Sequence, residues 1–151
     1  MLTRMVQVSL WYQSEETGGI VQASFTCDDE GHYQPNGQQD RIVSTSAPSV
    51  HPSTGLSAVL LGAVAGYRVF YQRSDETLAY LTFTNDDGWS SAGVVSQDTA
   101  RSALTIASGY TDTESITVVT PKDDRNIEVS ALEDDSWHIS EHILTCKYLI
   151  I

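Results

Sequence analysis

The chain has 151 residues, of which 40% are hydrophobic and 19% charged, so it can bury the core of one domain and is unlike a disordered chain. A net charge of −12 would repel phosphate backbones and anionic membranes, which excludes nucleic acid and lipid headgroups as favoured partners and leaves neutral or cationic ligands. The two cysteines, Cys27 and Cys146, are too few for a disulfide framework and are expected to be free thiols.

Targeting signals are not evident in the sequence. No apolar run approaches the roughly 18 residues that a membrane-spanning helix needs. Residues 1–8 lack the apolar core of a signal peptide. The sequence therefore predicts a protein that is cytoplasmic, or secreted without a signal peptide.

The N-terminal part of the chain reads as a β-hairpin followed by a loop. Residues 5–13 and 20–25 alternate as strands do, with a polar turn between them and an acidic turn at 27–33. Residues 34–53 are rich in Pro, Gln, Ser and Asn and are predicted to be mostly loop.

A second unit follows and is the most complete. The apolar run 55–62 is bounded by glycines, which predicts a strand buried on both faces at the innermost position. The remaining predicted elements are a strand over 67–72, a polar turn over 73–77, a strand over 78–83, an acidic turn over 85–88 and an outer strand over 89–96.

The same pattern recurs towards the C-terminus. The matched segments are 101–108 with 55–62, 115–120 with 67–71, 126–132 with 77–83, and 133–137 with 85–89. The offset is about 49 residues from Leu78 to Ile127 and 48 from Trp89 to Trp137. The N-terminal hairpin belongs to the same series, with Trp11 at the position of Phe70.

A period of roughly 40 to 50 residues holding about four short strands is typical of a β-propeller blade. We expect an all-β, propeller-like module over residues 1–151, with about three four-stranded blades in the approximate units 5–53, 54–100 and 101–142. Three blades are fewer than the roughly four to eight of known closed rings. The chain would therefore be half of a six-bladed ring completed by a homodimer, or a fragment of a longer protein. Residues 143–151 would form a terminal strand that completes the partner's first blade, or an exposed tail.

The second unit contains a motif with a known counterpart. Arg68-Val69-Phe70-Tyr71-Gln72 is followed by Asp75, by Leu78 and by Asp87-Gly88-Trp89. This pattern resembles the fungal fucose-specific lectin family of six-bladed β-propellers. The resemblance implies a sugar bound between adjacent blades, held by an arginine and a glutamate from one blade and stacked on tryptophan and tyrosine.

Carried over by position, the resemblance gives five candidate carbohydrate-binding residues. The arginine is Arg68, Tyr80 stands where the family has glutamate, Gln22 is the acceptor candidate of the first unit, and Trp89 and Trp137 are the closing aromatics. Arg68 could instead form an ion pair across the blade, and each tryptophan could instead anchor blade packing. In the third unit the two positions are Thr117 and Val129, with Glu128 on the other face of its strand.

The resemblance implies a non-catalytic, carbohydrate-binding lectin-like protein that binds fucose or a related neutral sugar and needs no cofactor or metal. A propeller that has lost sugar binding and acts as a protein-interaction scaffold is the alternative. A glycosidase with carboxylates paired in space is the third. The acidic turns lack the order of a calcium loop, and His138, His142 and Cys146 would be too far apart on a strand to hold zinc.

Overall fold

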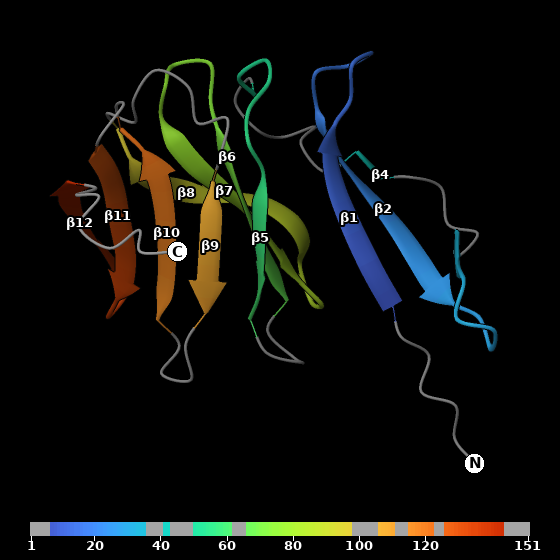
Figure 1. Ribbon diagram of the computed structural model, residues 1–151. Coiled ribbons are helices and arrows are strands. Elements are labelled where there is room, and N and C mark those ends of the chain that lie inside the picture. The colour runs from blue at the N-terminus through green and yellow to red at the C-terminus, as the bar shows by residue number, and fades with distance from the viewer. Residues whose placement is uncertain are drawn as a thin grey trace, which may run out of the picture.

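The protein folds into three antiparallel β-sheets, shown in the computed structural model of Figure 1. The structure describes residues 7–35, 41–42, 50–61, 66–97, 106–110, 115–122 and 126–143. Over these residues it contains twelve strands in three sheets of four. No helix among them is long and apolar enough to cross a membrane. The all-β fold with three four-stranded units is as expected from the sequence.

The first sheet is built on the predicted N-terminal hairpin. Its strands are β1 (Gln7–Gln13), β2 (Ile20–Cys27), β3 (Tyr33–Pro35) and β4 (Arg41–Ile42). β1 pairs with β2 along its whole length, and β3 and β4 both pair with β2. Residues 34–53 are predicted to be mostly loop; β3 and β4 take four of them, at 34–35 and 41–42, and residues 36–40 and 43–49 lie outside the described part. These ladders of three and two residues are too short to produce an alternating pattern.

The second sheet contains the hairpin that the sequence predicts most clearly. Its strands, in the order β5-β6-β7-β8, are β5 (Ser57–Leu60), β6 (Tyr67–Gln72), β7 (Leu78–Thr84) and β8 (Gly88–Ser96). The turn between β6 and β7 is closed by Arg73 N–H donating to Thr77 O at 2.9 Å. An ion pair of 2.9 Å between Arg73 and Asp75 adds to it.

The third sheet repeats the second. Its strands, in the order β12-β11-β10-β9, are β9 (Ala107–Tyr110), β10 (Ile116–Pro121), β11 (Asn126–Glu133) and β12 (Ser136–Ile143). The innermost strand starts at Ala107, so it shares Ala107 and Ser108 with the strand predicted over 101–108, while residues 101–105 lie outside the described part. The predicted terminal strand also lies outside it, except for Ile143, which ends β12.

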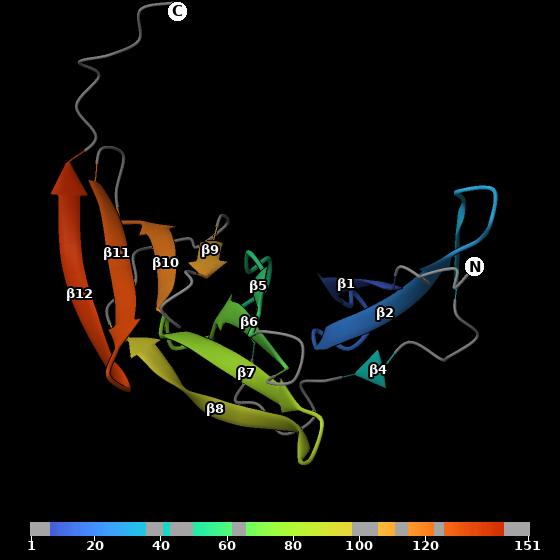
Figure 2. The same ribbon diagram turned by 90° about the horizontal axis from the view of Figure 1, so that it is seen from below.

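The three sheets are arranged like part of a fan. Figure 2 shows β9, β5 and β1 towards the inside and β12 and β8 towards the outside. The inner strands β5 and β9 are joined by a hydrogen bond of 2.7 Å between the hydroxyls of Ser57 and Ser108. β5 is thus innermost as predicted, but it is not buried on both faces, because Leu60 is 55% exposed while Val59 is buried. An innermost strand has only one hydrogen-bonded neighbour, which for β5 is β6.

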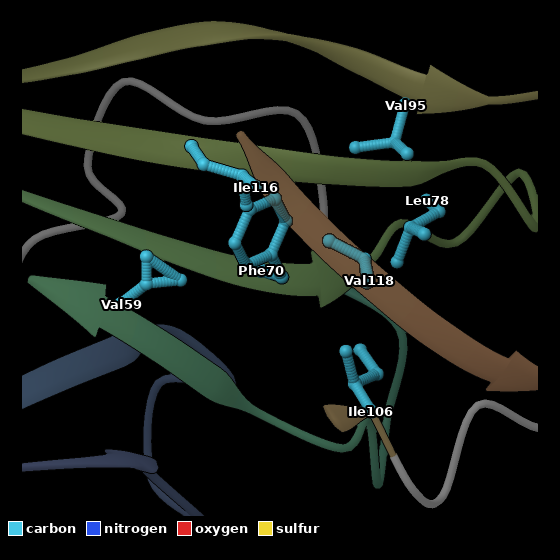
Figure 3. Close-up of a cluster of buried hydrophobic side chains, with 7 residues drawn as sticks. All are labelled: Val59, Phe70, Leu78, Val95, Ile106, Ile116 and Val118. Carbon is cyan, nitrogen blue, oxygen red and sulfur yellow. The ribbon is translucent and has the colours of Figure 1, made fainter. Parts of the chain in front are cut away.

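Apolar side chains fill the two junctions between neighbouring sheets. The first junction, between the first and second sheets, centres on Ile20, Tyr71, Ala79 and Leu81. The second junction, between the second and third sheets, is shown in Figure 3 and consists of Val59, Phe70, Leu78, Val95, Ile106, Ile116 and Val118. β6 serves both junctions, since Tyr71 points to one face and Phe70 to the other. This explains its continuous run of buried residues.

The connection between the first and second sheets is fixed by one amide side chain. Gln13, at the end of β1, donates from Nε2 to the carbonyl of His51 at 3.1 Å, and its Oε1 accepts from Ser53 N–H at 2.9 Å. On the other side of this segment, Thr54 Oγ1 accepts from Gln72 N–H at 2.7 Å. The segment that precedes β5 is therefore held between strands of two sheets.

Burial of Tyr71 predicts a loss of stability in alkali. Its burial raises the pKa of the phenol above the ordinary value of 10.0, an effect that Arg73 partly offsets. Because the folded-state pKa lies above the unfolded one, the contribution of the Tyr71 phenol to folding stability is fully present below about pH 10. It is lost as the pH rises through the folded-state pKa. We expect the urea midpoint to fall above pH 10. Tyr71→Phe should reduce that fall, and an identical pH dependence in this variant would contradict the prediction.

Candidate functional site

Strand pairing places the three units in one common register. Ser9, Arg68 and Thr117 occupy the same position, since they pair with Ser24, Thr82 and Ala131 respectively. Gln22, Tyr80 and Val129 likewise occupy the same position, since they pair with Trp11, Phe70 and Val119. Strand pairing thus matches the same residues across the three units as the repeat pattern of the sequence does. Arg68 is the only arginine among these six residues.

Arg68 lies in an aromatic environment at the second junction. Its guanidinium carbon is 5.1 Å from the centre of the Tyr80 ring, a cation–π arrangement. The Tyr80 ring is 6.0 Å from that of Trp137 on β12, and Phe70 lies 5.8 Å from Tyr80 and 6.0 Å from Trp137. We call Arg68, Phe70, Tyr80 and Trp137 the Arg68 cluster. It joins four residues that the sequence places on two separate units.

The outer strand β8 leaves room for the Tyr80 ring. Gly93 pairs with Tyr80, and a Cβ at this glycine would lie 3.0 Å from the Tyr80 hydroxyl oxygen. The register of β7 against β8 also shifts on either side of this pair. Tyr80 therefore lies across β8 and presents its ring face to Arg68, so its hydroxyl does not take the place of the family's glutamate beside the arginine.

The hydrogen-bonding capacity of Arg68 is not used within the described residues. Its Nε and Nη1 are buried and have no hydrogen-bond partner, and it forms no ion pair there. The hydroxyl of Thr82, directly opposite Arg68, is also buried and without a partner. Buried donors without acceptors cost free energy, so this arrangement favours a ligand that supplies acceptors.

Trp89 and Gln22 belong to the first junction. Trp89 ends a series of ring contacts from Trp11 to Tyr67 at 5.6 Å, to Phe83 at 5.8 Å and to Trp89 at 5.4 Å. Gln22 donates from Nε2 to the Ser9 hydroxyl at 3.2 Å. In the first unit, Ser9 stands at the position that Arg68 occupies in the second unit, and its hydroxyl already accepts a hydrogen bond from the Gln22 amide. The five predicted site residues thus divide between two junctions, and the one cation among these five, Arg68, lies at the second.

The third unit has neither an arginine at the position of Arg68 nor an aromatic ring at the position of Tyr80. Thr117 and Val129 face away from the second sheet, whereas Val118 and Ser130 face towards it. Glu128 shares the face of Ser130, as expected from its place in the strand, and is 3% exposed. Among the described residues no three His, Cys, Asp or Glu side chains are grouped as a metal site would require, and Cys146 lies outside that part of the chain.

Sequence reasoning missed Thr82. Threonine is common in strands, and only the pairing of β6 with β7 shows that this hydroxyl lies opposite Arg68. The available signal was the register of the predicted hairpin, which places residue 82 across from residue 68.

Comparison with known proteins supports the fold. No model of a protein family matches the sequence, and no curated protein does. Among solved structures the chain is similar to AofleA from Arthrobotrys oligospora, with a TM-score of 0.72 and 20% identity, over 95% of this chain and 41% of that one. It is also similar to the fucose-specific lectin from Aleuria aurantia, with a TM-score of 0.63 and 19% identity, over 90% of this chain and 39% of that one.

A third similar structure has a different length. The fucose lectin from Kordia zhangzhouensis, solved in complex with methyl-fucoside, gives a TM-score of 0.63 and 13% identity, over 92% of either chain. The chain thus spans less than half of the two fungal proteins and nearly all of the bacterial one. The Aleuria aurantia lectin has a six-bladed β-propeller fold. The predicted likeness to fucose-lectin propellers is confirmed for the fold, and the three sheets have the architecture of propeller blades.

Proposed function

We propose that this protein is a non-catalytic, carbohydrate-binding lectin that holds fucose or a related neutral sugar between its second and third blades. The observation that carries the proposal is the unsatisfied Arg68, whose buried Nε and Nη1 lack partners while its guanidinium lies over Tyr80. Similarity of the fold to the fucose lectins from Aleuria aurantia and Kordia zhangzhouensis supports it.

Each residue of the Arg68 cluster has a role suited to a pyranose. Arg68 donates charge-assisted hydrogen bonds to ring hydroxyls, and Thr82 adds a hydroxyl that can donate or accept. Trp137 is half-buried and offers its ring to the C–H face of the sugar. Phe70 is fully buried and holds Tyr80 and Trp137 in place. The Gln22 and Trp89 positions of the first junction form a weaker second site.

Two copies of the chain would complete a ring and provide several sites. The free face of the first blade exposes Val8, Leu10 and Tyr12, which alternate along β1. The free face of the third blade carries Val119 and Val129, both half-buried. Joining these apolar faces would close a six-bladed propeller, and multiple shallow sites then gain through avidity.

A protein-interaction scaffold is the second candidate, and one observation favours it. Tyr80 stands where a carboxylate would accept sugar hydroxyls, so the Arg68 cluster lacks that acceptor. Under this alternative the aromatic side chains only pack the blades together.

Titration calorimetry with methyl α-L-fucoside, on protein whose mass is measured by light scattering, tests the proposal. We expect saturable binding at millimolar sugar, a ring of two chains, and an Arg68→Ala affinity about 10-fold to 100-fold lower, since hydrogen bonds to charged groups contribute about 1.5–3 kcal/mol. Arg73→Ala is the matched control, because it removes an arginine that already pairs with Asp75 in a turn. Absence of binding, or equal binding by the Arg68→Ala variant, would leave the scaffold as the better account.

A further inference from the structure

We propose that the Arg68 cluster prefers a sugar that carries a carboxylate, such as a uronic or sialic acid, over a neutral sugar. The inference rests on the proposed function, because it places the ligand at the same site. It concerns the charge of that ligand, which follows from the groups that surround Arg68.

The second blade provides no carboxylate for Arg68. Its four strands have the sequences SAVL, YRVFYQ, LAYLTFT and GWSSAGVVS, in which Arg68 is the one charged residue. Directly across the strand pair lies Thr82, and the guanidinium lies over the uncharged ring of Tyr80. On the third blade, the cluster is closed by Trp137. Glu128 of the third blade is a buried carboxylate that faces the same junction, but the described residues show no ion pair between it and Arg68. Arg68 therefore lacks the paired carboxylate that an arginine–glutamate site would have.

An acidic ligand fits this charge better than a hydroxyl does. A guanidinium can hold a carboxylate along the Nε/Nη2 edge or the Nη1/Nη2 edge, with two parallel hydrogen bonds. Each of these edges includes one of the two buried nitrogens that lack a partner. A neutral hydroxyl offers one acceptor atom and no charge, so it compensates the partly buried cation less completely.

The net charge of −12 does not remove this preference. The acidic residues of the neighbouring hairpin turns are Asp75, Glu76, Asp86, Asp87, Glu133, Asp134 and Asp135, and all seven are exposed. Exposed charges act through water and are screened beyond about 8 Å at physiological ionic strength. A direct contact with a partly buried guanidinium is screened much less. The overall charge therefore slows the approach of an anion more than it weakens the bound complex.

A matched pair of ligands tests the inference. Methyl α-L-fucoside and methyl α-L-galactosiduronate share one ring stereochemistry and differ at C6, which is a methyl group in the first and a carboxylate in the second. Methyl β-D-glucuronide and the methyl α-glycoside of N-acetylneuraminic acid separate uronic from sialic acids. Sodium acetate serves as a probe for binding of a carboxylate without a sugar. We expect at least one acidic glycoside to bind the full chain tenfold or more tightly than the fucoside, and acetate to bind much more weakly.

Substitutions at residue 80 connect the preference to Arg68. Tyr80→Glu places a carboxylate beside the guanidinium and is expected to reverse the preference, so that the fucoside binds more tightly than the acidic glycosides. Tyr80→Phe keeps the ring under the guanidinium and should preserve the preference for the acid. Urea unfolding of each variant verifies that it is folded before titration.

The possible results separate the inference from the proposed function. Fucoside binding that is equal to or tighter than that of all three acids would overturn the inference and leave the lectin function intact. No binding of any glycoside would overturn both. Acetate binding as tight as the best acidic glycoside would show a simple anion site and would also overturn the inference.

Discussion

Gly66→Ala is expected to destabilise the protein by about 3–5 kcal/mol, because two separate penalties meet at this residue. Gly66 has a φ of 104°, which side chains rarely adopt. A Cβ at this position would lie 1.7 Å from the carbonyl oxygen of Phe83 and 2.8 Å from its carbonyl carbon. These are backbone atoms of β7, so relief requires the strands of the hairpin to move apart. Urea unfolding monitored by circular dichroism measures the loss.

Gly88→Ala is the matched control. Gly88 has a φ of 72°, but nothing lies within 4 Å of the Cβ that alanine would add. It should therefore lose only about 1–2 kcal/mol for the left-handed backbone conformation. The difference between the two variants isolates the contact of Gly66 with β7. Equal losses would contradict the close approach.

The central hairpin could be predicted because its signals are local. The strand predicted over 67–72 is β6 without any shift, and the strand predicted over 78–83 is one residue shorter than β7. Aromatic and β-branched residues define both strands, and the polar turn with Asp75 closes the chain reversal. A pattern contained in about 20 residues depends little on the rest of the fold.

The weaker predictions depended on long-range contacts. β3 and β4 exist because β2 offers them a pairing edge, and their sequences alone carry no strand signal. The burial expected for Leu60 also failed, because an apolar run does not show whether another element covers each face of its strand. β9 extends two residues beyond the strand predicted over 101–108, because its pairing with β10 runs from Ala107 to Tyr110.

The candidate site was predicted as separate residues but not as a group. Arg68 and Tyr80 could be connected through one hairpin, whereas Trp137 joins them only when the third blade packs on the second. Tyr80 uses its ring face towards Arg68, while its hydroxyl lies against Gly93. The orientation of an aromatic ring depends on which neighbours leave space, and a glycine on the adjacent strand is not recognisable from sequence alone.

The junction that holds the site predicts a second large effect on stability. Phe70 is fully buried, lies 5.8 Å from Tyr80 and 6.0 Å from Trp137, and belongs to the core shown in Figure 3. Phe70→Ala is expected to cost about 3–5 kcal/mol, through lost burial and the cavity that remains. Phe70→Leu keeps much of the volume and should cost about 1–1.5 kcal/mol. Urea unfolding measures both values.

Phe25→Ala removes the same side chain from a half-buried position on β2 and serves as the control. It should cost clearly less than Phe70→Ala, because water already reaches part of the ring. Ligand affinity should fall in Phe70→Leu and not in Phe25→Ala, since only Phe70 positions Tyr80 and Trp137 beside Arg68. A Phe70→Ala variant that loses no more stability than Phe25→Ala would mean that the second and third blades are not held together by this core.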